Sequence, residues 1–180
     1  MAFAGCPVLS RRLLLGGLAA AVVGLPPGSA IADTVRRLTL VRRASSEVGH
    51  NVPFWRDGAP DHQGLAELNW LMRDVRAAEV SPIDLRVYYL LAVLQAEFGG
   101  RPIIITSGYR TQATNEWLME QGIDAARNSF HLRGRAADFQ IWGVAPDRMA
   151  ALGSLLGLGG VGIYASFVHL DTGPQRVWRG

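Results

Sequence analysis

The order in which the spacing of apolar residues changes along the chain is the feature that most constrains its fold. In "LAELNWLMRDVRAAE" (65–79) apolar side chains recur every three or four residues, as on one face of a helix. From residue 101 the pattern changes: "RPIIITSGYR" contains a short apolar run typical of a buried strand, and "AADFQI" and "FVHLD" alternate as strands do. Helices followed by a group of strands predict an α+β domain.

Turn and capping residues set the limits of the expected elements. Residues 33–64 are rich in Gly, Pro, Asn and Asp, which predicts an irregular segment of short strands and loops. A second helix should begin at Ser81 as N-cap, with Pro82 in the first helical position, and stop at Gly99–Gly100. The other expected elements are a buried strand running into a turn over 101–110, helices over 111–122 and 146–156, and short strands around 160–164, 167–171 and 176–179. We therefore expect a main domain over 65–180, in which N-terminal helices pack on a small, mainly antiparallel sheet.

Residues 1–32 have the three parts of an export signal: a basic start, an apolar run and a small-x-small cleavage site at 30–32. The apolar run is 13 residues long, too short to span a bilayer, which needs about 20 helical residues. Arg11 and Arg12 directly precede it, as in a twin-arginine (Tat) signal. We expect cleavage after Ala32, no stable membrane anchor afterwards, and a periplasmic or other extracytoplasmic location reached by the Tat pathway.

Composition limits the partners of the mature chain. All 18 basic residues are arginine, and no basic run is interleaved with aromatic residues, which argues against nucleic-acid binding. Removal of the signal takes two arginines and no acid, so the remaining surface is close to neutral. Cys6, the only cysteine, is lost with the signal. The stability of the mature protein, expected to be a monomer, must therefore come from core packing or a metal rather than a disulfide.

Two segments place metal-binding side chains on strand faces. In "SFHLRGRAADF" (129–139), alternation puts Asp138 opposite the apolar face of its strand, and Gly134 interrupts any helix, so His131 should lie in a loop or preceding strand. In "FVHLD", His169 shares a face with Asp171. If the two strands pair antiparallel, His169 and Asp138 become neighbours with Cβ atoms about 5 Å apart. Two histidines and one aspartate with a fourth position open suit catalytic zinc, although spacing alone leaves open that they are hydrogen-bonded structural residues.

Three sequence blocks together resemble a known family. "SFHLRGRAADF" matches the Ser-x-His-x-x-Gly-x-Ala-x-Asp signature of the zinc D-Ala-D-Ala carboxypeptidase and murein endopeptidase superfamily, and "ITSGYRT" and "GVGIYASFVHLDTGPQRVW" resemble its other two blocks, in the family's order. The similarity extends from about Glu67 to Trp178 and is greatest to the exported murein endopeptidase branch. It implies a hedgehog/D-Ala-D-Ala peptidase-like fold, peptidoglycan peptides as substrate, and a Zn²⁺ cofactor held by His131, Asp138 and His169.

The resemblance also implies roles for residues around the metal. Arg110 resembles the family arginine that stabilises the oxyanion of the tetrahedral intermediate, a role that suits a permanently charged fork of donors. The alternative for Arg110 is an ordinary ion pair. Ser129 resembles the signature serine near the substrate pocket, and Tyr109 is expected to shape that pocket.

The general base is a point where this chain departs from many carboxypeptidases of the superfamily. These carry a glutamate three residues before the last histidine ligand, and this position is Ser166 here. Asp171 is the candidate substitute, because it lies on the same strand face as His169. Two alternatives remain: Asp171 orients His169 or caps the following turn, or the base comes from elsewhere in the chain.

The sequence therefore predicts an exported zinc metallopeptidase that hydrolyses amide bonds in peptidoglycan cross-links, with Asp171 and Arg110 as its catalytic residues. The missing glutamate keeps a rival from another class open. On that reading the chain is a non-catalytic, zinc-containing module of the same fold that binds murein or a partner. A D,D- or L,D-carboxypeptidase is a third reading.

Overall fold

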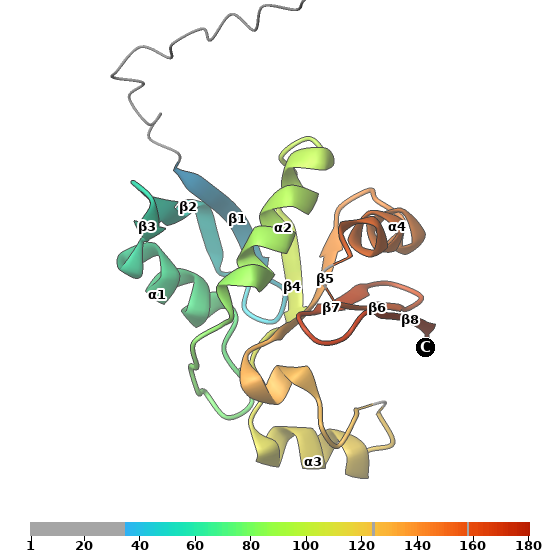
Figure 1. The fold of residues 1–180 in the computed structure, drawn as a ribbon. Helices are drawn as coiled ribbons and strands as arrows, with labels where there is room; N and C mark the ends of the chain where they lie inside the picture. The colour runs from blue at the N-terminus through green and yellow to red at the C-terminus, as the bar shows by residue number, and fades with distance from the viewer. Residues whose placement is uncertain (1–34, 124, 158) are drawn as a thin grey trace, which may run out of the picture. The chain divides into compact units, whose positions relative to one another are not determined.

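The computed structural model describes residues 35–123, 125–157 and 159–180, so the predicted signal peptide lies outside the described residues. The described chain is an α+β fold built from one eight-stranded sheet and four α-helices (Figure 1). In chain order the elements are β1 (Arg36–Arg42), β2 (Val48–Arg56), β3 (Ala59–Pro60), α1 (His62–Leu71), α2 (Leu85–Glu97), β4 (Ile103–Ser107), α3 (Gln112–Glu120), the 3-10 helix η1 (Phe130–Arg133), β5 (Ala136–Ile141), α4 (Pro146–Leu156), β6 (Gly160–Ile163), β7 (Val168–Asp171) and β8 (Arg176–Arg179).

The sheet is mixed, with the strand order β3-β2-β1-β4-β5-β7-β6-β8. Among the described strands, five of the seven pairings are antiparallel, and only β1 with β4 and β6 with β8 run parallel. Antiparallel pairing therefore dominates, as expected, in a sheet that is larger than the sequence suggests.

The segment before residue 65 differs from its expected irregular structure. It contributes β1, β2 and β3, which form one side of the same sheet. Asn51 has a left-handed backbone (φ 55°), and its N–H donates to the hydroxyl of Thr39 where the register between β1 and β2 shifts. Asn51, a residue type that favours turns, therefore forms a bulge within β2, and the strand continues on both sides of it.

The first helix ends at Leu71, eight residues before the end that apolar spacing predicts. The cause is Asp74, whose carboxylate accepts hydrogen bonds from the backbone N–H groups of Arg76 and Ala77 and from both the N–H and hydroxyl of Thr111. This buried carboxylate organises residues 72–79 as turns and ties them to the start of α3.

The second helix begins at Leu85 with Asp84 as its N-cap, so the expected cap at Ser81 is wrong. The residues before it stay outside the helix, because the N–H of Ile83 donates to the side chain of Asn69 and the N–H of Asp84 donates to the carbonyl of Gly134. The entry to α2 is therefore fastened to the turn that follows η1. The expected helices over 111–122 and 146–156 are confirmed as α3 and α4.

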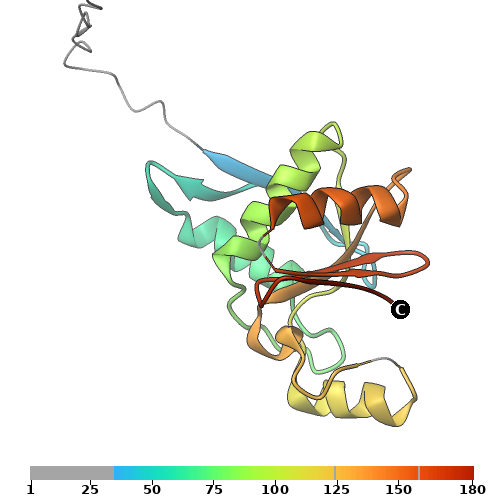
Figure 2. The same cartoon turned by 45° about the vertical axis from the view of Figure 1, so that its right-hand side comes forward.

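One face of the sheet carries the hydrophobic core. Helices α1, α2 and α4 all contribute side chains to one buried cluster, and α4 packs on β6 and β7 and contacts α2 (Figure 2). On β5 and β7 the residues that join this cluster are Ala137, Phe139, Ile141, Val168 and Leu170. Strand alternation then turns the intervening residues of β5 and β7 to the opposite face. In the described part of the chain, no helix is long and apolar enough to cross a membrane.

Candidate metal centre

Three polar side chains from separate elements meet on the face of the sheet opposite the core. Asp138 of β5 and His169 of β7 are directly opposite each other in the antiparallel ladder, as strand alternation predicts. His131 reaches them from η1, which ends at Gly134 in a left-handed conformation (φ 60°). All three residues are buried, and one ligand atom from each lies within 4.8 Å of the others. The chain thus brings together the histidines and the aspartate that the sequence singles out.

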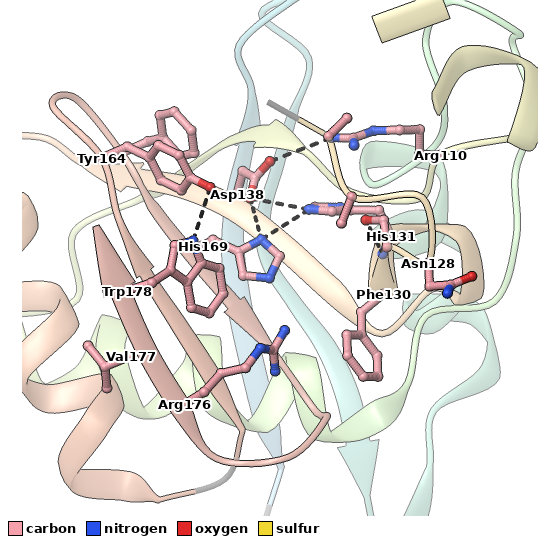
Figure 3. Close-up of a pocket in the computed structure, with 14 residues that line it drawn as sticks. Arg110, Asn128, Phe130, His131, Asp138, Tyr164, His169, Arg176, Val177 and Trp178 are labelled. Atoms are coloured by element: carbon pink, nitrogen blue, oxygen red, sulfur yellow. Dashed lines mark hydrogen bonds and ion pairs between the residues drawn. The ribbon is translucent and has the colours of Figure 1, made fainter. Parts of the chain in front are cut away.

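The distances within this group suit a small tetrahedral ion. Nε2 of His131 lies 3.2 Å from Oδ1 of Asp138 and 3.2 Å from Nδ1 of His169. Nδ1 of His169 lies 2.8 Å from the same carboxylate oxygen (Figure 3). Two ligand atoms on a tetrahedral zinc, at bond lengths near 2.0 Å, are separated by about 3.3 Å. Small adjustments would bring the three atoms into that geometry.

Hydrogen bonds behind the two histidines determine which ring nitrogens face the centre. Nδ1 of His131 contacts the carbonyl oxygen of Gly108 at 2.6 Å, and Nε2 of His169 contacts a carboxylate oxygen of Asp171 at 3.0 Å. A carbonyl and an ionised carboxylate only accept, so these outer nitrogens donate and the inner nitrogens of neutral rings present lone pairs. Together with Asp138, three electron-pair donors then face one point, an arrangement that needs a cation.

The raised pKa of His169 also shows that its surroundings stabilise a positive charge. Burial alone would lower the pKa of His169, but hydrogen bonds to Asp138 and Asp171 outweigh it and raise the pKa to about 9. Burial would likewise raise the pKa of Asp138, but the neighbouring His131 and His169 hold it below its usual range. A proton can therefore occupy the place that a metal would take.

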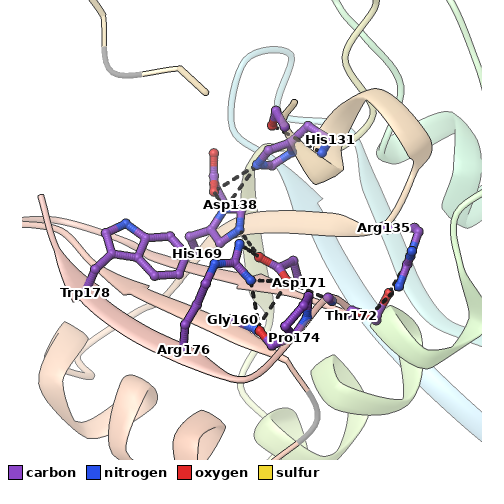
Figure 4. Close-up of polar contacts among 12 residues, drawn as sticks. His131, Arg135, Asp138, Gly160, His169, Asp171, Thr172, Pro174, Arg176 and Trp178 are labelled. Carbon is purple, nitrogen blue, oxygen red and sulfur yellow. Dashed lines mark hydrogen bonds and ion pairs between the residues drawn. The ribbon is translucent and has the colours of Figure 1, made fainter. Parts of the chain in front are cut away.

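Asp171 lies behind His169 and is not among the residues that line the cavity (Figure 4). Its side chain is fully buried, and its carboxylate accepts from Arg176 at 2.6 Å and from the backbone N–H groups of Gly160 and Gly173. Burial would raise the pKa of Asp171, but the bonds from His169 and Arg176 lower it. This position favours the alternative in which Asp171 orients His169 over the one in which it contacts substrate.

Arg110 lies beside Asp138, in the loop between β4 and α3. One of its terminal nitrogens lies 3.8 Å from Oδ2 of Asp138 and donates to the hydroxyl of Ser107, and the other donates to the side chain of Asn115. The backbone N–H of Arg110 also donates to the carbonyl of His131. The guanidinium is held beside the three converging residues and borders the cavity.

A cavity of about 490 Å³ opens over this group, and aromatic side chains form part of its wall. The aromatic side chains that line it are Phe130, Tyr164, Phe167 and Trp178. The indole of Trp178 lies beside the His169 ring, with centroids 5.3 Å apart. Gly162 makes this approach possible, because it lies between them in the sheet, and a Cβ there would come within 2.7 Å of the indole. A glycine inside a short strand is the signal in the sequence that indicates such a close approach.

The other residues named from the sequence occupy different surroundings. Ser129 lines the cavity, and its hydroxyl caps η1 by accepting from the N–H of His131. Tyr109 is outside the cavity lining, and its hydroxyl donates to Glu79. Ser166 is exposed and its carbonyl accepts from Gln140, so it too lies outside the cavity lining.

A family model described as peptidoglycan L,D-endopeptidase MepK matches residues 30–178 of the chain. The chain belongs to this family. It is 36% identical over 174 residues to the peptidoglycan L,D-endopeptidase MepK of Escherichia coli strain K12, a match that covers 93% of this chain and 96% of the relative. It is 38% identical over 120 residues to the probable peptidoglycan L,D-endopeptidase MepK of Haemophilus influenzae, covering 64% of each chain. The resemblance to murein endopeptidases inferred from three short blocks is thereby confirmed.

Proposed function

We propose that this protein is a zinc-dependent endopeptidase that hydrolyses amide bonds between an L- and a D-centre in the peptide cross-links of peptidoglycan. The observation that carries the proposal is the convergence of two imidazole nitrogens and one carboxylate oxygen at the floor of a cavity, beside a fixed guanidinium. The names of the family's members support the choice of substrate and bond. They also favour cleavage within cross-links over removal of a terminal D-alanine.

The ligand set assigned to zinc consists of Nε2 of His131, Oδ1 of Asp138 and Nδ1 of His169. Bound zinc would supply the Lewis acid that activates a water and polarises the scissile carbonyl. The chain itself holds the two imidazoles in place through the carbonyl of Gly108 and the carboxylate of Asp171. Because both imidazoles already point their lone pairs inward, the site is arranged before any substrate arrives.

Arg110 is assigned to the oxygen that becomes negatively charged when the amide carbonyl is attacked. Its guanidinium borders the cavity and is fixed by Ser107 and Asn115, so its charge needs little reorganisation during the reaction. Ser129 is assigned to the adjoining rim, where it both lines the cavity and shapes η1. Asp171 becomes a positioning residue for His169 in this proposal, in place of the general base that strand alternation suggested.

An extracytoplasmic location follows from a peptidoglycan substrate, and the Tat pathway is our proposal for the route. Replacement of Arg11 and Arg12 by lysine should leave the precursor in the cytoplasm. Unchanged appearance of the protein in the periplasm would refute the Tat route without affecting the proposed reaction.

Purified sacculi and defined cross-linked muropeptides provide the direct test of the reaction. The protein should contain about one zinc per chain and convert L,D-cross-linked dimers to monomers, and His131→Ala should lose both metal and cleavage. Full metal content with intact dimers would instead favour a binding module. Release of only a terminal D-alanine would favour a carboxypeptidase.

A further inference from the structure

Arg176 is a second guanidinium at the cavity, and the proposed reaction gives it no role. It is the first residue of β8 and lines the cavity, as Arg110 does. In the sheet, β5 and β7 lie between β8 and β4, the strand that precedes Arg110. The two arginines therefore reach the cavity from opposite sides of the strands that carry Asp138 and His169.

Two aromatic rings and a buried carboxylate hold Arg176 in place. Its guanidinium carbon lies 5.3 Å from the ring centroid of Phe130 and 4.9 Å from that of Trp178, and both rings also line the cavity. Figure 3 shows the guanidinium between these two rings. Because the side chain is already ordered, a ligand that binds to it loses little affinity to the ordering of this group.

The hydrogen bonds of Arg176 leave one edge of its guanidinium for a ligand. Nη1 and Nη2 donate to the two carboxylate oxygens of Asp171, at 3.2 and 2.6 Å, and Nη1 also donates to the carbonyl of Pro174. These three contacts use three of its five N–H groups. Among the described residues, Nε and the second N–H of Nη2 have no acceptor. They form the other edge of the planar fork.

This edge is accessible from the cavity. The side chain of Arg176 is 41% exposed, whereas that of Asp171 is fully buried. An ion pair with Asp171 alone would account for the edge that Asp171 occupies, but not for the second edge or for its position in the cavity lining. An anion that enters the cavity can therefore meet a fixed pair of donors.

The proposed substrate presents such an anion beside the bond that breaks. An amide between an L- and a D-centre uses the carboxyl group of the L-centre and the amino group of the D-centre. The D-centre therefore keeps its own carboxyl group, on the carbon atom bonded to the nitrogen that leaves. Where this group is neither amidated nor extended, it is ionised at neutral pH. A guanidinium edge binds a carboxylate through two parallel hydrogen bonds.

We propose that Arg176 determines specificity for cross-links with a free carboxylate on the D-centre that supplies the leaving amine. This inference rests on the proposed endopeptidase function. Arg110 is assigned to the carbonyl oxygen, and Arg176 takes the carboxylate on the amine side. The two contacts together fix the direction in which the cross-link lies across the cavity. Cross-links in which this carboxyl group is amidated are then poor substrates.

The test uses two L,D-cross-linked muropeptide dimers that differ only at this carboxyl group, which is free in one and a primary amide in the other. For the zinc-loaded wild-type protein, kcat/KM should be about 10- to 100-fold higher with the free carboxylate, the usual effect of hydrogen bonds between charged groups. In Arg176→Gln this ratio should fall below about threefold, because a neutral side chain does not favour the charged form. Arg176→Lys keeps the charge without the fork and should give an intermediate ratio.

The ratio of the two kcat/KM values separates recognition from a purely structural role of Arg176. Weaker support of Asp171, or a lower zinc content, would reduce cleavage of both dimers by the same factor and leave the ratio unchanged. Arg179→Gln is the matched control, because Arg179 also belongs to β8 but pairs with Asp147 and is outside the cavity lining. This variant should keep the wild-type ratio.

Three results would overturn the inference while the endopeptidase function stands. They are equal cleavage of the two dimers by the wild-type protein, a wild-type ratio in Arg176→Gln, and an equal loss of the ratio in Arg179→Gln, which would assign the preference to overall charge. If the zinc-loaded wild-type protein cleaves neither dimer, the endopeptidase function itself is rejected, and the inference with it.

Discussion

At the scale of single residues, the two histidines contribute different ring nitrogens to the centre. His169 lies directly across the ladder from Asp138, so Nδ1, the nitrogen nearer its backbone, meets the carboxylate. His131 approaches from η1 and extends Nε2. The sequence could predict all three residues, because strand alternation selects Asp138 and His169 and the family signature adds His131. The sequence could not predict that the carbonyl of Gly108 contacts His131. Every residue has a backbone carbonyl, so residue type does not indicate which one, here 23 residues away, makes the contact.

Asp171→Asn tests whether Asp171 positions His169 or acts on the substrate. The amide keeps the volume but loses the charge that stabilises the donating ring nitrogen, and loss of such a partner typically weakens metal binding by 10–100-fold. We expect zinc affinity to fall by about that factor, measured by competition with a chromogenic chelator. Turnover at saturating zinc should recover at least partly. Unaltered zinc affinity with abolished turnover would return Asp171 to the role of general base.

Arg110→Lys tests the oxyanion role of Arg110. Lysine keeps a positive charge but lacks the planar fork that contacts Ser107 and Asn115. Loss of a positioned oxyanion donor typically costs 10²–10³ in rate, so we expect kcat to fall by about 100-fold with zinc content unchanged. Wild-type kcat in this variant would assign Arg110 to an ordinary ion pair with Asp138.

At the scale of elements, local signals predicted the limits of α3 and α4, and distant contacts decided the end of α1 and the start of α2. Helix α4 has the predicted limits, because Pro146 lies in its first turn and Gly157 ends it in a left-handed conformation. The end of α1 was predicted wrongly because Asp74 takes its partner from Thr111, 37 residues further on. The pairing of β5 with β7 was predictable because each has an apolar face and a polar face, so only one orientation buries the apolar one.

Asp74→Ala should destabilise the fold and alter its response to acid. Burial would raise the pKa of Asp74, but hydrogen bonds from Thr111 and neighbouring groups lower it below its unfolded value. The stabilisation is therefore fully present above about pH 4 and is lost as the pH falls toward the lower folded value. At neutral pH we expect a loss of about 1–3 kcal/mol in urea denaturation, because buried donors lose their acceptor. The difference from wild type should shrink below pH 4, and a constant difference would contradict this account.

Gly162→Ala tests the closeness of β6 to the Trp178 indole. The added methyl would lie 2.7 Å from ring atoms, so the indole must move away from His169. Such overpacking typically costs 1–3 kcal/mol. We expect a lower melting temperature, altered tryptophan fluorescence and reduced kcat. Gly99→Ala is not a suitable control, because Gly99 has a positive φ (74°). Ser154→Ala is suitable, because Ser154 is an exposed residue of α4.

At the scale of the whole molecule, the sheet separates the hydrophobic core, which stabilises the fold, from the candidate metal centre. The buried hydrophobic cluster lies against the helices on one face, and the three proposed metal ligands lie on the other. The α+β class could be predicted from patterns along single elements, and the convergence of the three proposed ligands could be predicted from strand alternation together with the family signature. The sheet's β1–β4 pairing could not, since it joins strands about 60 residues apart whose apolar sequences fit several partners.

Removal of the metal should therefore inactivate the protein without unfolding it. After chelation we expect the far-UV circular dichroism spectrum to persist and the melting temperature to fall, because a ligand that binds only the folded state stabilises it by mass action. Readdition of zinc should restore both the melting temperature and muropeptide cleavage. A metal-free chain that lost its secondary structure would show that zinc is needed for folding and that the core alone is insufficient.

The positions of the three proposed ligands along the chain determine when the site can form during protein synthesis. His131 and Asp138 are made before His169, and the strand that carries His169 pairs with β5 only after α4 and β6 have been made. A nascent chain that stops at α3 holds none of the ligands, and one that stops at α4 holds only two. On the proposed ligand assignment, zinc loading is therefore a late event, and a chain interrupted before β7 lacks the complete ligand set that the proposed hydrolysis needs.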